Sequence, residues 1–383
     1  MKCKLSDICS FRKGKVEVEN LNAKNYISTE NMLPNKCGIT EASSLPTVSL
    51  TQEYNSGDVL VSNIRPYFKK IWQAEYDGGC SNDVLVFVPK PNTDKAFLYY
   101  VLADDDFFTY SMATSMGTKM PRGDKTSIMQ YEVPLIDLQV QKKIASVLKA
   151  LDERIKLNNE INNNLAEQSQ AIFAEFMCKY PYVLSPLGDM AEIIDCLHSK
   201  KPKAVNGTTY QLLQLNNITD SGFLDLSSKY YISKSDYENW TRKCEIVEGD
   251  CVITNVGRIG AVSQAPNGTH AAMGRNMTCI RLRNDKPFYS YLITALLSPH
   301  IRREIMKNTD EGTIMGALNV KNIPLLLFPM FALPTMNALE DLLSPIRKAI
   351  EQNYLSNQML SLLRDSLLPR LMSGELDVSN IEI

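Results

Sequence analysis

The side chains that most often carry out catalysis are sparse in this sequence, and their spacing does not suit catalysis. The three histidines, His198, His270 and His300, form neither an HxxH nor an HExxH pair, so a metal-dependent hydrolase has little support. There is no GxxxxGK[ST] loop for a nucleotide, no GxSxG nucleophile motif and no asparagine-proline-proline-aromatic stretch of an amino-methyltransferase. We therefore expect no catalytic residue, no metal site and no cofactor.

Three other features imitate functional motifs, and each has a plainer interpretation. The stretch NVGRIG lacks the GxGxxG spacing of a dinucleotide-binding loop, and a partial match is weak support for one. Asp104, Asp105 and Asp106 lie in a polar segment, where they are expected to form a solvated face or a helix cap rather than a metal site. The nine cysteines include no CxxC pair, which indicates reduced, mostly buried thiols.

Cations and amides in several loops could perform a different kind of chemistry, the binding of a nucleic acid. Lysine and arginine bind phosphates, whereas hydrogen-bonding side chains read the edges of bases. In the first half of the chain the candidates come from NIRPYFKK and SMGTKMPRGDK: Arg65, Tyr67, Lys69, Lys70, Lys119, Arg122 and Lys125. In the second half they come from HSKKPK, NVGRIG and GRN: Lys200, Lys201, Lys203, Asn255, Arg258, Arg275 and Asn276.

These candidates compete with a simpler explanation. Single lysines and arginines are common on any solvated surface, so each residue alone is as well explained by that role, and the clusters are more informative than their members. The formal net charge is -2 and the pI is near 6.0, so the chain as a whole is not basic. If DNA is the partner, the positive charge must be local.

The loops that carry these residues belong to an internal repeat, and such a repeat decides the architecture. GDVLVSNIRPYFKKIWQA from Gly57 resembles GDCVITNVGRIGAVSQA from Gly249, with Asn63 opposite Asn255. Further along, Asn82 is matched with Asn276, and both halves share a Gly-Thr-x-Met stretch that leads to a proline, Pro134 or Pro329. We expect two similar globules built from short strands such as DVLVS and CVIT and short helices such as KAFLYYVLA and FYSYLITALL.

Each globule is followed by a long stretch with apolar residues at alternating steps of four and three, which predicts a helix with a heptad seam. The seam positions in the first helix are Ile144, Leu148, Leu151, Ile155, Asn158, Asn162 and Leu165. In the second helix they are Leu339, Leu343, Ile346, Ile350, Asn353, Asn357 and Leu360. The first helix is expected over Val140–Met177, and the second is expected to begin near Pro345 or to bend there, because proline is disfavoured inside a helix.

Both seams become polar at the same two positions, which are Asn158 and Asn162 in one helix and Asn353 and Asn357 in the other. Buried asparagines pair in few alignments, so they exchange stability for a defined register. The alternative is that the asparagines lie on a face that has turned to solvent, in which case the seam ends locally.

Length and composition agree with a folded protein of two domains. The 383 residues exceed one typical core, and 44% hydrophobic with 22% charged residues is ordinary for globular proteins. No apolar run reaches the length of a membrane span, and the N-terminus lacks the apolar centre of a signal peptide, so we expect a cytosolic protein. With Pro181 and Pro186 as breakers, the expected segments are a globule over 1–134, a long helix over 135–180, a globule over 181–330 and a second helix with a tail over 331–383.

The chain resembles the specificity subunit of type I restriction and modification enzymes. The most specific matches are LQVQKKIASVLKALDERI, EQSQAIFAEF and the ending LLRDSLLPRLMSGELDV, while Met336 departs from a glutamine that Gln141 supplies in the first helix. The resemblance implies an α+β chain: two similar mixed α/β target recognition domains separated by two conserved helices that form an antiparallel coiled coil. It also implies double-stranded DNA as ligand, two methyltransferase subunits and two motor and nuclease subunits as partners, and recognition of a split target that directs adenine methylation or cleavage by those partners.

Two other classes of protein compete with this interpretation. An autonomous nuclease or methyltransferase with fused recognition domains would need cofactor or metal motifs, and the sequence offers none that we can identify. A purely structural scaffold would need the helices but would have little reason to keep two globules whose cationic loops differ. A non-catalytic subunit that recognises DNA is therefore the leading hypothesis.

Overall fold

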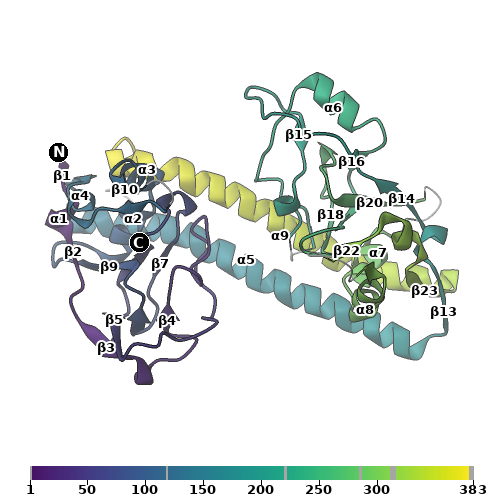
Figure 1. Ribbon diagram of the computed structural model, residues 1–383, viewed down its shortest axis with the longest axis horizontal. Coiled ribbons are helices and arrows are strands. Elements are labelled where there is room, and N and C mark those ends of the chain that lie inside the picture. The colour runs from purple at the N-terminus through teal and green to yellow at the C-terminus, as the bar shows by residue number, and fades with distance from the viewer. Residues whose placement is uncertain (1, 118–119, 220–221, 284–286, 311–315, 379–383) are drawn as a thin grey trace. The chain divides into compact units, whose positions relative to one another are not determined.

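The computed structural model describes residues 2–117, 120–219, 222–283, 287–310 and 316–378. The chain divides into two compact units, of which unit 1 comprises Met1–Ile155 and Met359–Ile383 and unit 2 comprises Lys156–Gln358. Each unit contains short strands and short helices, and the two longest helices, α5 and α9, each contribute to both units (Figure 1). This confirms the predicted class of two mixed α/β globules with two long helices.

Unit 1 is built on two four-stranded sheets with the orders β2-β9-β6-β7 and β3-β5-β8-β4. Two short pairs, β1 with β12 and β10 with β11, complete it. Its strands are β1 (Lys2–Lys4), β2 (Cys9–Phe11), β3 (Lys15–Glu17), β4 (Tyr26–Ile27), β5 (Leu50–Tyr54), β6 (Val59–Ser62), β7 (Ile71–Gln73), β8 (Gly78–Cys80), β9 (Val84–Pro89), β10 (Ser115–Met116), β11 (Arg122–Gly123) and β12 (Glu132–Pro134).

Three helices of unit 1, namely α2, α3 and α4, begin after an aspartate that caps them. Asp94, Asp104 and Asp124 each accept hydrogen bonds from backbone N–H groups in the first turn of a helix. Asp104 therefore caps a helix, as the sequence predicted. The helical segments are α1 (Leu5–Ile8), η1 (Val18–Asn20), η2 (Pro66–Phe68), α2 (Lys95–Ala103), α3 (Asp105–Ala113) and α4 (Lys125–Ile128).

Unit 2 repeats this plan with a four-stranded sheet, β14-β20-β17-β18, and a three-stranded sheet, β15-β19-β16. Its strands are β13 (Tyr182–Pro186), β14 (Ala191–Asp195), β15 (Gln211–Leu212), β16 (Glu245–Val247), β17 (Cys251–Thr254), β18 (Val262–Gln264), β19 (His270–Ala272), β20 (Met277–Leu282), β21 (Thr309–Asp310), β22 (Ala317–Leu318) and β23 (Leu327–Phe331). Its helical segments are η3 (Leu187–Asp189), η4 (Leu215–Asn217), α6 (Lys234–Trp240), α7 (Tyr289–Leu296), α8 (Pro299–Lys307) and η5 (Val320–Leu325).

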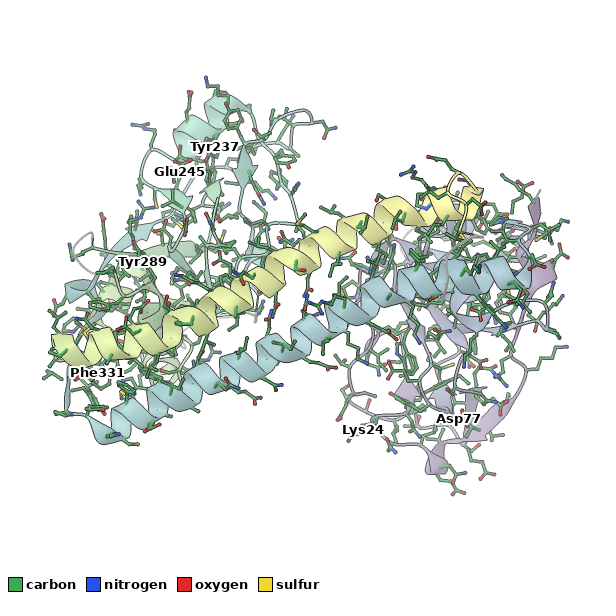
Figure 2. All side chains as sticks on the ribbon, turned by 180° about the vertical axis from the view of Figure 1, so that it is seen from behind. Lys24, Asp77, Tyr237, Glu245, Tyr289 and Phe331 are labelled. Carbon is green, nitrogen blue, oxygen red and sulfur yellow. The ribbon has the colours of Figure 1, made fainter. Side chains whose placement is uncertain are left out.

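The outer part of unit 2 is fastened by polar contacts between these elements. The hydroxyl of Tyr237 on α6 donates to the Glu245 carboxylate on β16 at 2.6 Å, and Figure 2 labels both residues. Residues 182–186, which lie between the predicted helix breaker Pro181 and η3, form β13 and pair with β23. The extended Tyr-Val-Leu-Ser-Pro run satisfies its backbone groups on that partner strand.

The Gly-Asp motifs of the repeat turn out to support the fold. The Asp58 carboxylate accepts from the N–H of Asn55 at 2.8 Å, and the Asp250 carboxylate accepts from the N–H of Val247 at 2.9 Å. Both carboxylates are buried and are neutralised by an arginine, Arg12 for Asp58 and Arg281 for Asp250. These aspartates therefore hold a tight turn and an internal ion pair in each unit.

One match within the repeat needs correction by one residue. The N–H of Asn63 donates to the carbonyl of Asp83, and the N–H of Asn255 donates to the carbonyl of Asn276. The ladders β6·β9 and β17·β20 have the same offset, since Val59 faces Phe87 and Cys251 faces Ile280. Asn276 thus corresponds to Asp83 rather than to Asn82. The predicted match was off by one because Asn82 and Asn276 are both asparagines, whereas the strand pairing sets the true correspondence.

Helices α5 (Leu138–Lys179) and α9 (Leu333–Ser373) pack against the globular part of each unit. In unit 1 the buried core includes Ile144 and Leu148 of α5 with Leu368 and Leu371 of α9. In unit 2 it includes Phe173 of α5 and a row of α9 residues, namely Met336, Leu339 and Leu343. The remaining predicted seam positions are buried or half-buried: Leu151, Ile155, Leu165, Ile346, Ile350 and Leu360.

Within unit 2 the asparagines pair between the two helices. The Asn158 amide donates to Asn357 Oδ1 at 2.8 Å, and the Asn353 amide donates to Asn162 Oδ1 at 2.9 Å. Numbers rise along one helix as they fall along the other, so the helices run antiparallel here. Asn158 is only 2% exposed, which excludes the alternative that this side of the helix faces solvent.

The second long helix begins earlier than the sequence suggested. It starts at Leu333, so Pro334 occupies its first turn, and it continues through Pro345, which lies at an exposed position. The missing glutamine is also compensated. Gln141 accepts from the N–H of Asp94 just before α2, whereas Glu340 accepts from the N–H groups of Ser290 and Tyr291 at the start of α7.

Candidate nucleic-acid interface

In unit 1 the structure brings two of the predicted cationic loops together. The N–H of Arg65 donates to the carbonyl of Pro121 at 2.9 Å, and Ile64 forms a bridge with Arg122. Arg65 has a left-handed backbone with φ of 52°, and its Nε is buried without a hydrogen-bond partner among the described residues. Tyr67 is half-exposed beside these loops. Lys119 lies outside the residues that the structure describes.

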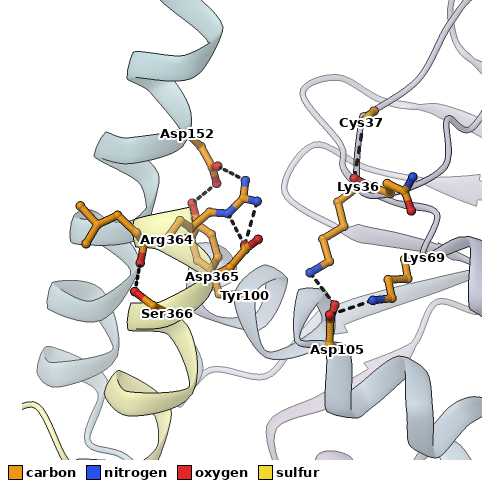
Figure 3. A network of polar contacts seen from close by, with 11 residues as sticks. Lys36, Cys37, Lys69, Tyr100, Asp105, Asp152, Arg364, Asp365 and Ser366 are labelled. Carbon is orange, nitrogen blue, oxygen red and sulfur yellow. Dashed lines mark hydrogen bonds and ion pairs between the residues drawn. The ribbon is translucent and has the colours of Figure 1, made fainter. Parts of the chain in front are cut away.

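Three of the predicted cations of unit 1 have partners within the unit. Lys69 Nζ lies 2.7 Å from Asp105, to which Lys36 also binds, as Figure 3 shows. Arg122 pairs with Asp83 at 3.0 Å. Lys70 donates to the carbonyl of Thr29 at 2.6 Å, and burial lowers the pKa of its amine.

Lys125 stands apart from that group. Its Nζ lies 5.9 Å from the centre of the Phe11 ring, and the residue opens helix α4 rather than either of the two joined loops. The structure thus brings Arg65, Tyr67, Lys69, Lys70 and Arg122 onto neighbouring loops, and it places Lys125 on another element.

In unit 2 three of the predicted residues line a single hollow of about 310 Å³, which we call the unit 2 hollow. Lys201 contributes to it from the loop after β14, with its Nζ 3.8 Å from the centre of the Tyr230 ring. Arg275 and Asn276 contribute from the turn before β20, where Asn276 has φ of 63°. Lys200 and Lys203 are exposed near Lys201 in sequence but do not line this hollow.

Sequence reasoning missed the other polar side chains of the unit 2 hollow. Gln214 and Asn216 line it from η4 and the residue before it, and Trp240 lines it from the end of α6. A signal for the first two did exist. Gln214-x-x-Asn217 repeats the spacing of Ser28-x-x-Asn31, and in both cases the asparagine side chain accepts from the first residue's N–H, at 2.6 Å.

Two predicted residues of unit 2 serve other purposes. Asn255 is 7% exposed, and its amide donates to the carbonyl of Leu318 while its Oδ1 accepts from Thr278. Arg258 donates to the carbonyl of Ile218 at 2.9 Å and lines a different hollow with Arg302. Asn255 therefore joins β17 to β22, and the prediction that it contacts DNA has no support from its position.

Among the described residues, two clusters have a composition that could hold a metal ion, the buried Cys244, Asp250 and Cys279 and the more exposed Asp195, Cys196 and His198. His198 Nε2 lies 2.8 Å from Asp195 Oδ2, and His198 Nδ1 lies 4.0 Å from the Cys196 sulfur. Cys196 is buried, and burial raises the pKa of its thiol, so it is a poor nucleophile in this setting. The spacing Asp-Cys-x-His is visible in the sequence.

The two long helices carry a second kind of exposed surface, which is apolar. On α9 the side chains of Leu355, Met359, Leu362 and Leu363 are exposed at spacings that place them on one side of the helix, and Met359 and Leu362 are each 72% exposed. On α5, Leu157 and Ile161 are similarly exposed. Among the described residues, no helix is long and apolar enough to cross a membrane.

Comparison with known proteins identifies relatives of this chain. Residues 1–167 match the model of the family described as type I restriction modification DNA specificity domain. The HindI type I specificity subunit of Haemophilus influenzae is 27% identical over 164 residues, which cover 40% of this chain and 36% of that protein. The MjaIX specificity subunit of Methanocaldococcus jannaschii is 20% identical over 322 residues, covering 77% of this chain and 72% of that protein.

The matched length differs among the relatives. The EcoDI specificity subunit of Escherichia coli is 26% identical over 37% of this chain and 33% of its own length. The chain therefore spans about a third of the length of the HindI and EcoDI proteins that it matches.

The fold extends the likeness over the whole chain. The crystal structure of a type I S subunit from M. genitalium aligns with a TM-score of 0.55 and 14% identity, covering 99% of this chain and 96% of that one. At this identity the match concerns the fold, in which both units and both long helices take part. The family match over residues 1–167 and the named relatives make this chain similar to type I restriction–modification specificity subunits, and the shared fold agrees with that likeness.

Proposed function

We propose that this protein recognises a split sequence in double-stranded DNA, with one half-site bound by unit 1 and the other by unit 2. The single observation that carries the proposal is the duplication, in which both units contain a four-stranded sheet of the same order but present different side chains. A duplicated reader is suited to two half-sites, because each copy can diverge in its contacts while the frame is kept. The recognition domains would correspond to residues 1–134 and 181–330, with helical segments 135–180 and 331–383.

We further propose that the chain directs chemistry carried out by partner subunits. Methyltransferase subunits would modify adenine, and motor and nuclease subunits would cleave unmodified DNA, with two copies of each. The exposed apolar residues of α9 and α5 support such an assembly, since apolar surface of this kind is typical of protein interfaces. Because the substrate is chromosomal DNA, the complex would act in the cytoplasm.

The proposed mechanism has two stages. Lysines and arginines first hold the complex on the phosphates, which makes binding dependent on salt. Hydrogen-bonding side chains of each unit then test base edges in the major groove. A base inside a stacked duplex is inaccessible to a methyltransferase, so the partner subunit would extrude the adenine after binding.

The alternative of an autonomous nuclease or methyltransferase has less support. Among the described residues, the Asp195, Cys196 and His198 cluster combines a thiol with a histidine, but that thiol is buried and burial raises its pKa. A purely structural scaffold is also disfavoured, because the unit 2 hollow gathers cations and amides that no scaffold requires.

Hydroxyl-radical footprinting tests this proposal. The chain would be purified with its methyltransferase partner and bound to a genomic fragment that contains a methylated site. We expect two protected segments separated by an unprotected gap, with protection lost at high salt. A single continuous protected segment, or equal protection at every sequence, would contradict the proposal.

A further inference from the structure

We propose that the unit 2 hollow reads base edges directly, with Arg275 contacting a guanine of the half-site that unit 2 recognises. This inference rests on the proposed function and adds a residue and a base to it. The hollow is open, holds about 310 Å³ and is lined by Arg275, Asn276, Asn216, Gln214 and Lys201. Its side chains are thus the groups that bind bases and phosphates.

Comparison of the two units separates residues that maintain the same backbone structure in both from exposed residues that differ between them. Asn31 and Asn217 are buried at 4% and 0% exposure, and each accepts from a backbone N–H three residues earlier. The carbonyls of Asp83 and Asn276 likewise accept from the N–H groups of Asn63 and Asn255. The backbone around the hollow therefore has the same construction in both units.

The side chains presented on this frame differ between the units. Glu30 corresponds to Asn216, and Asn82 corresponds to Arg275, and all four are exposed. Asp83 pairs with Arg122 in unit 1, whereas the equivalents in unit 2 are Asn276 and Ala317, which cannot form an ion pair. Two half-sites of different sequence require different exposed polar side chains. We therefore expect the two units to share a backbone structure and to differ in these side chains.

Arg275 is the residue of the hollow best suited to read a base. Unlike Arg281, which is held by Asp250, Arg275 is exposed and forms no hydrogen bond or ion pair with the residues that the structure describes. An available guanidinium donates two parallel hydrogen bonds to O6 and N7 of guanine, and an asparagine amide makes the corresponding pair with adenine. Asn276, next to Arg275, would therefore read a neighbouring adenine.

The test measures binding of the complex with its methyltransferase partner to short duplexes that carry the split target or a single-base substitution. Arg275→Ala is expected to lower the preference for guanine at one position of one half-site by about 5- to 150-fold, while all other positions keep their preferences. Arg275→Lys should retain part of the preference, since lysine also reaches guanine. Arg303→Ala, at an exposed arginine of α8 outside the hollow, is the matched control and should change no position.

Three outcomes would overturn the inference. If Arg275→Ala weakens binding to every duplex equally, the side chain contacts a phosphate; if it changes nothing, it contacts no DNA; and if the affected position is not guanine, the assigned base is wrong. An unchanged thermal unfolding midpoint verifies that the variant is folded, which is expected for an exposed side chain without internal partners. If the wild-type complex itself shows no split target, it is the proposed function that fails.

Discussion

Acidic side chains neutralise part of the positive charge on the loops of unit 1 that are predicted to bind DNA. Asp105 holds both Lys36 and Lys69, at 2.9 and 2.7 Å (Figure 3). Burial raises the pKa of the Asp105 carboxyl, but hydrogen bonds from Lys69 and Lys36 outweigh it, so the pKa lies below its ordinary value. The carboxylate is therefore ionised at neutral pH and neutralises part of this surface.

Replacing Asp105 with asparagine should strengthen DNA binding. The variant frees two lysines, so we expect severalfold tighter binding and a salt dependence steeper by up to about one counterion. Titration of labelled duplex at several salt concentrations measures both quantities. Asp77→Asn is the control, since it removes the same charge at an exposed carboxylate that accepts from the N–H of Ser56. Equal effects of the two substitutions would show that only net charge matters.

The same carboxylate should have a small and pH-dependent effect on stability. A carboxyl with a lowered pKa stabilises the fold above the unfolded value near 3.8, and this contribution is lost as the pH falls through the folded value. Because the Asp105 side chain is 60% exposed, we expect less than about 1 kcal/mol at pH 7. Urea unfolding of wild type and Asp105→Asn at pH 7 and pH 3 measures it, and a difference that grows at pH 3 would contradict this account.

Another ion pair of unit 1, between Asp152 and Arg364, joins the two long helices. Arg364 lies 2.7 Å from Asp152, which also accepts from the Tyr100 hydroxyl at 2.7 Å (Figure 3). The two charged side chains are 23% and 29% exposed, so their interaction is screened less than that of a surface pair. A double-mutant cycle with alanine should give a coupling free energy of about 1–2 kcal/mol.

The matched control for this cycle is Lys149 with Glu153, a pair on the same helix at 3.3 Å whose side chains are more than half exposed. Its coupling free energy should be no more than about 0.5 kcal/mol. Urea unfolding measures both cycles. Equal coupling in the two pairs would mean that burial of Asp152 and Arg364 adds nothing.

At the scale of elements, the asparagine pairs of α5 and α9 are expected to set register at a cost in stability. Asn158→Leu alone deprives Asn357 Oδ1 of its donor, so we expect a loss of about 1–3 kcal/mol. Asn158→Leu with Asn357→Leu should recover that loss and exceed wild-type stability, since an apolar pair suits a helix seam. Unfolding in urea distinguishes the three proteins. A double variant less stable than the single one would contradict the role assigned to these residues.

The exposed apolar side of α9 is expected to bind the methyltransferase partner. Met359→Gln with Leu362→Gln should lower the recovery of that partner in co-purification severalfold, without changing the unfolding midpoint, because both residues are 72% exposed. Val48→Gln, at a residue 56% exposed in a loop of unit 1, is the matched control. Undiminished recovery of the partner with the double variant would place its binding site elsewhere.

For the whole molecule, the sequence predicted architecture better than it predicted the site. The heptad spacing and the repeated motifs were sufficient for two mixed units and two long helices, because such periodicities are written in the chain itself. The sequence allowed α9 either to start near Pro345 or to bend there, and a start at Pro345 is wrong because a proline at this exposed position is accommodated within the helix. β13 was missed because its partner, β23, lies about 145 residues away in sequence.

The candidate site was harder to predict because its members come from distant segments. Lys201, Gln214, Trp240 and Arg275 meet only after the sheets of unit 2 form. The Asn255 side chain is of a type that can hydrogen-bond to base edges, but it is already hydrogen-bonded to Leu318 and Thr278. Side-chain type indicates which chemistry is possible, and burial decides whether it is available.

The measurement that tests the central claim most directly is sequencing of methylated adenines in a host that expresses this chain with its methyltransferase partner. Wild type is compared with a unit 2 variant, Lys200, Lys201 and Lys203 to glutamine, and a unit 1 variant, Tyr67 to alanine with Lys125 to glutamine, at two exposed residues. We expect a split target in wild type, with one half weakened by the first variant and the other half by the second. A continuous target, or variants that weaken both halves alike, would contradict the assignment of one unit to each half-site.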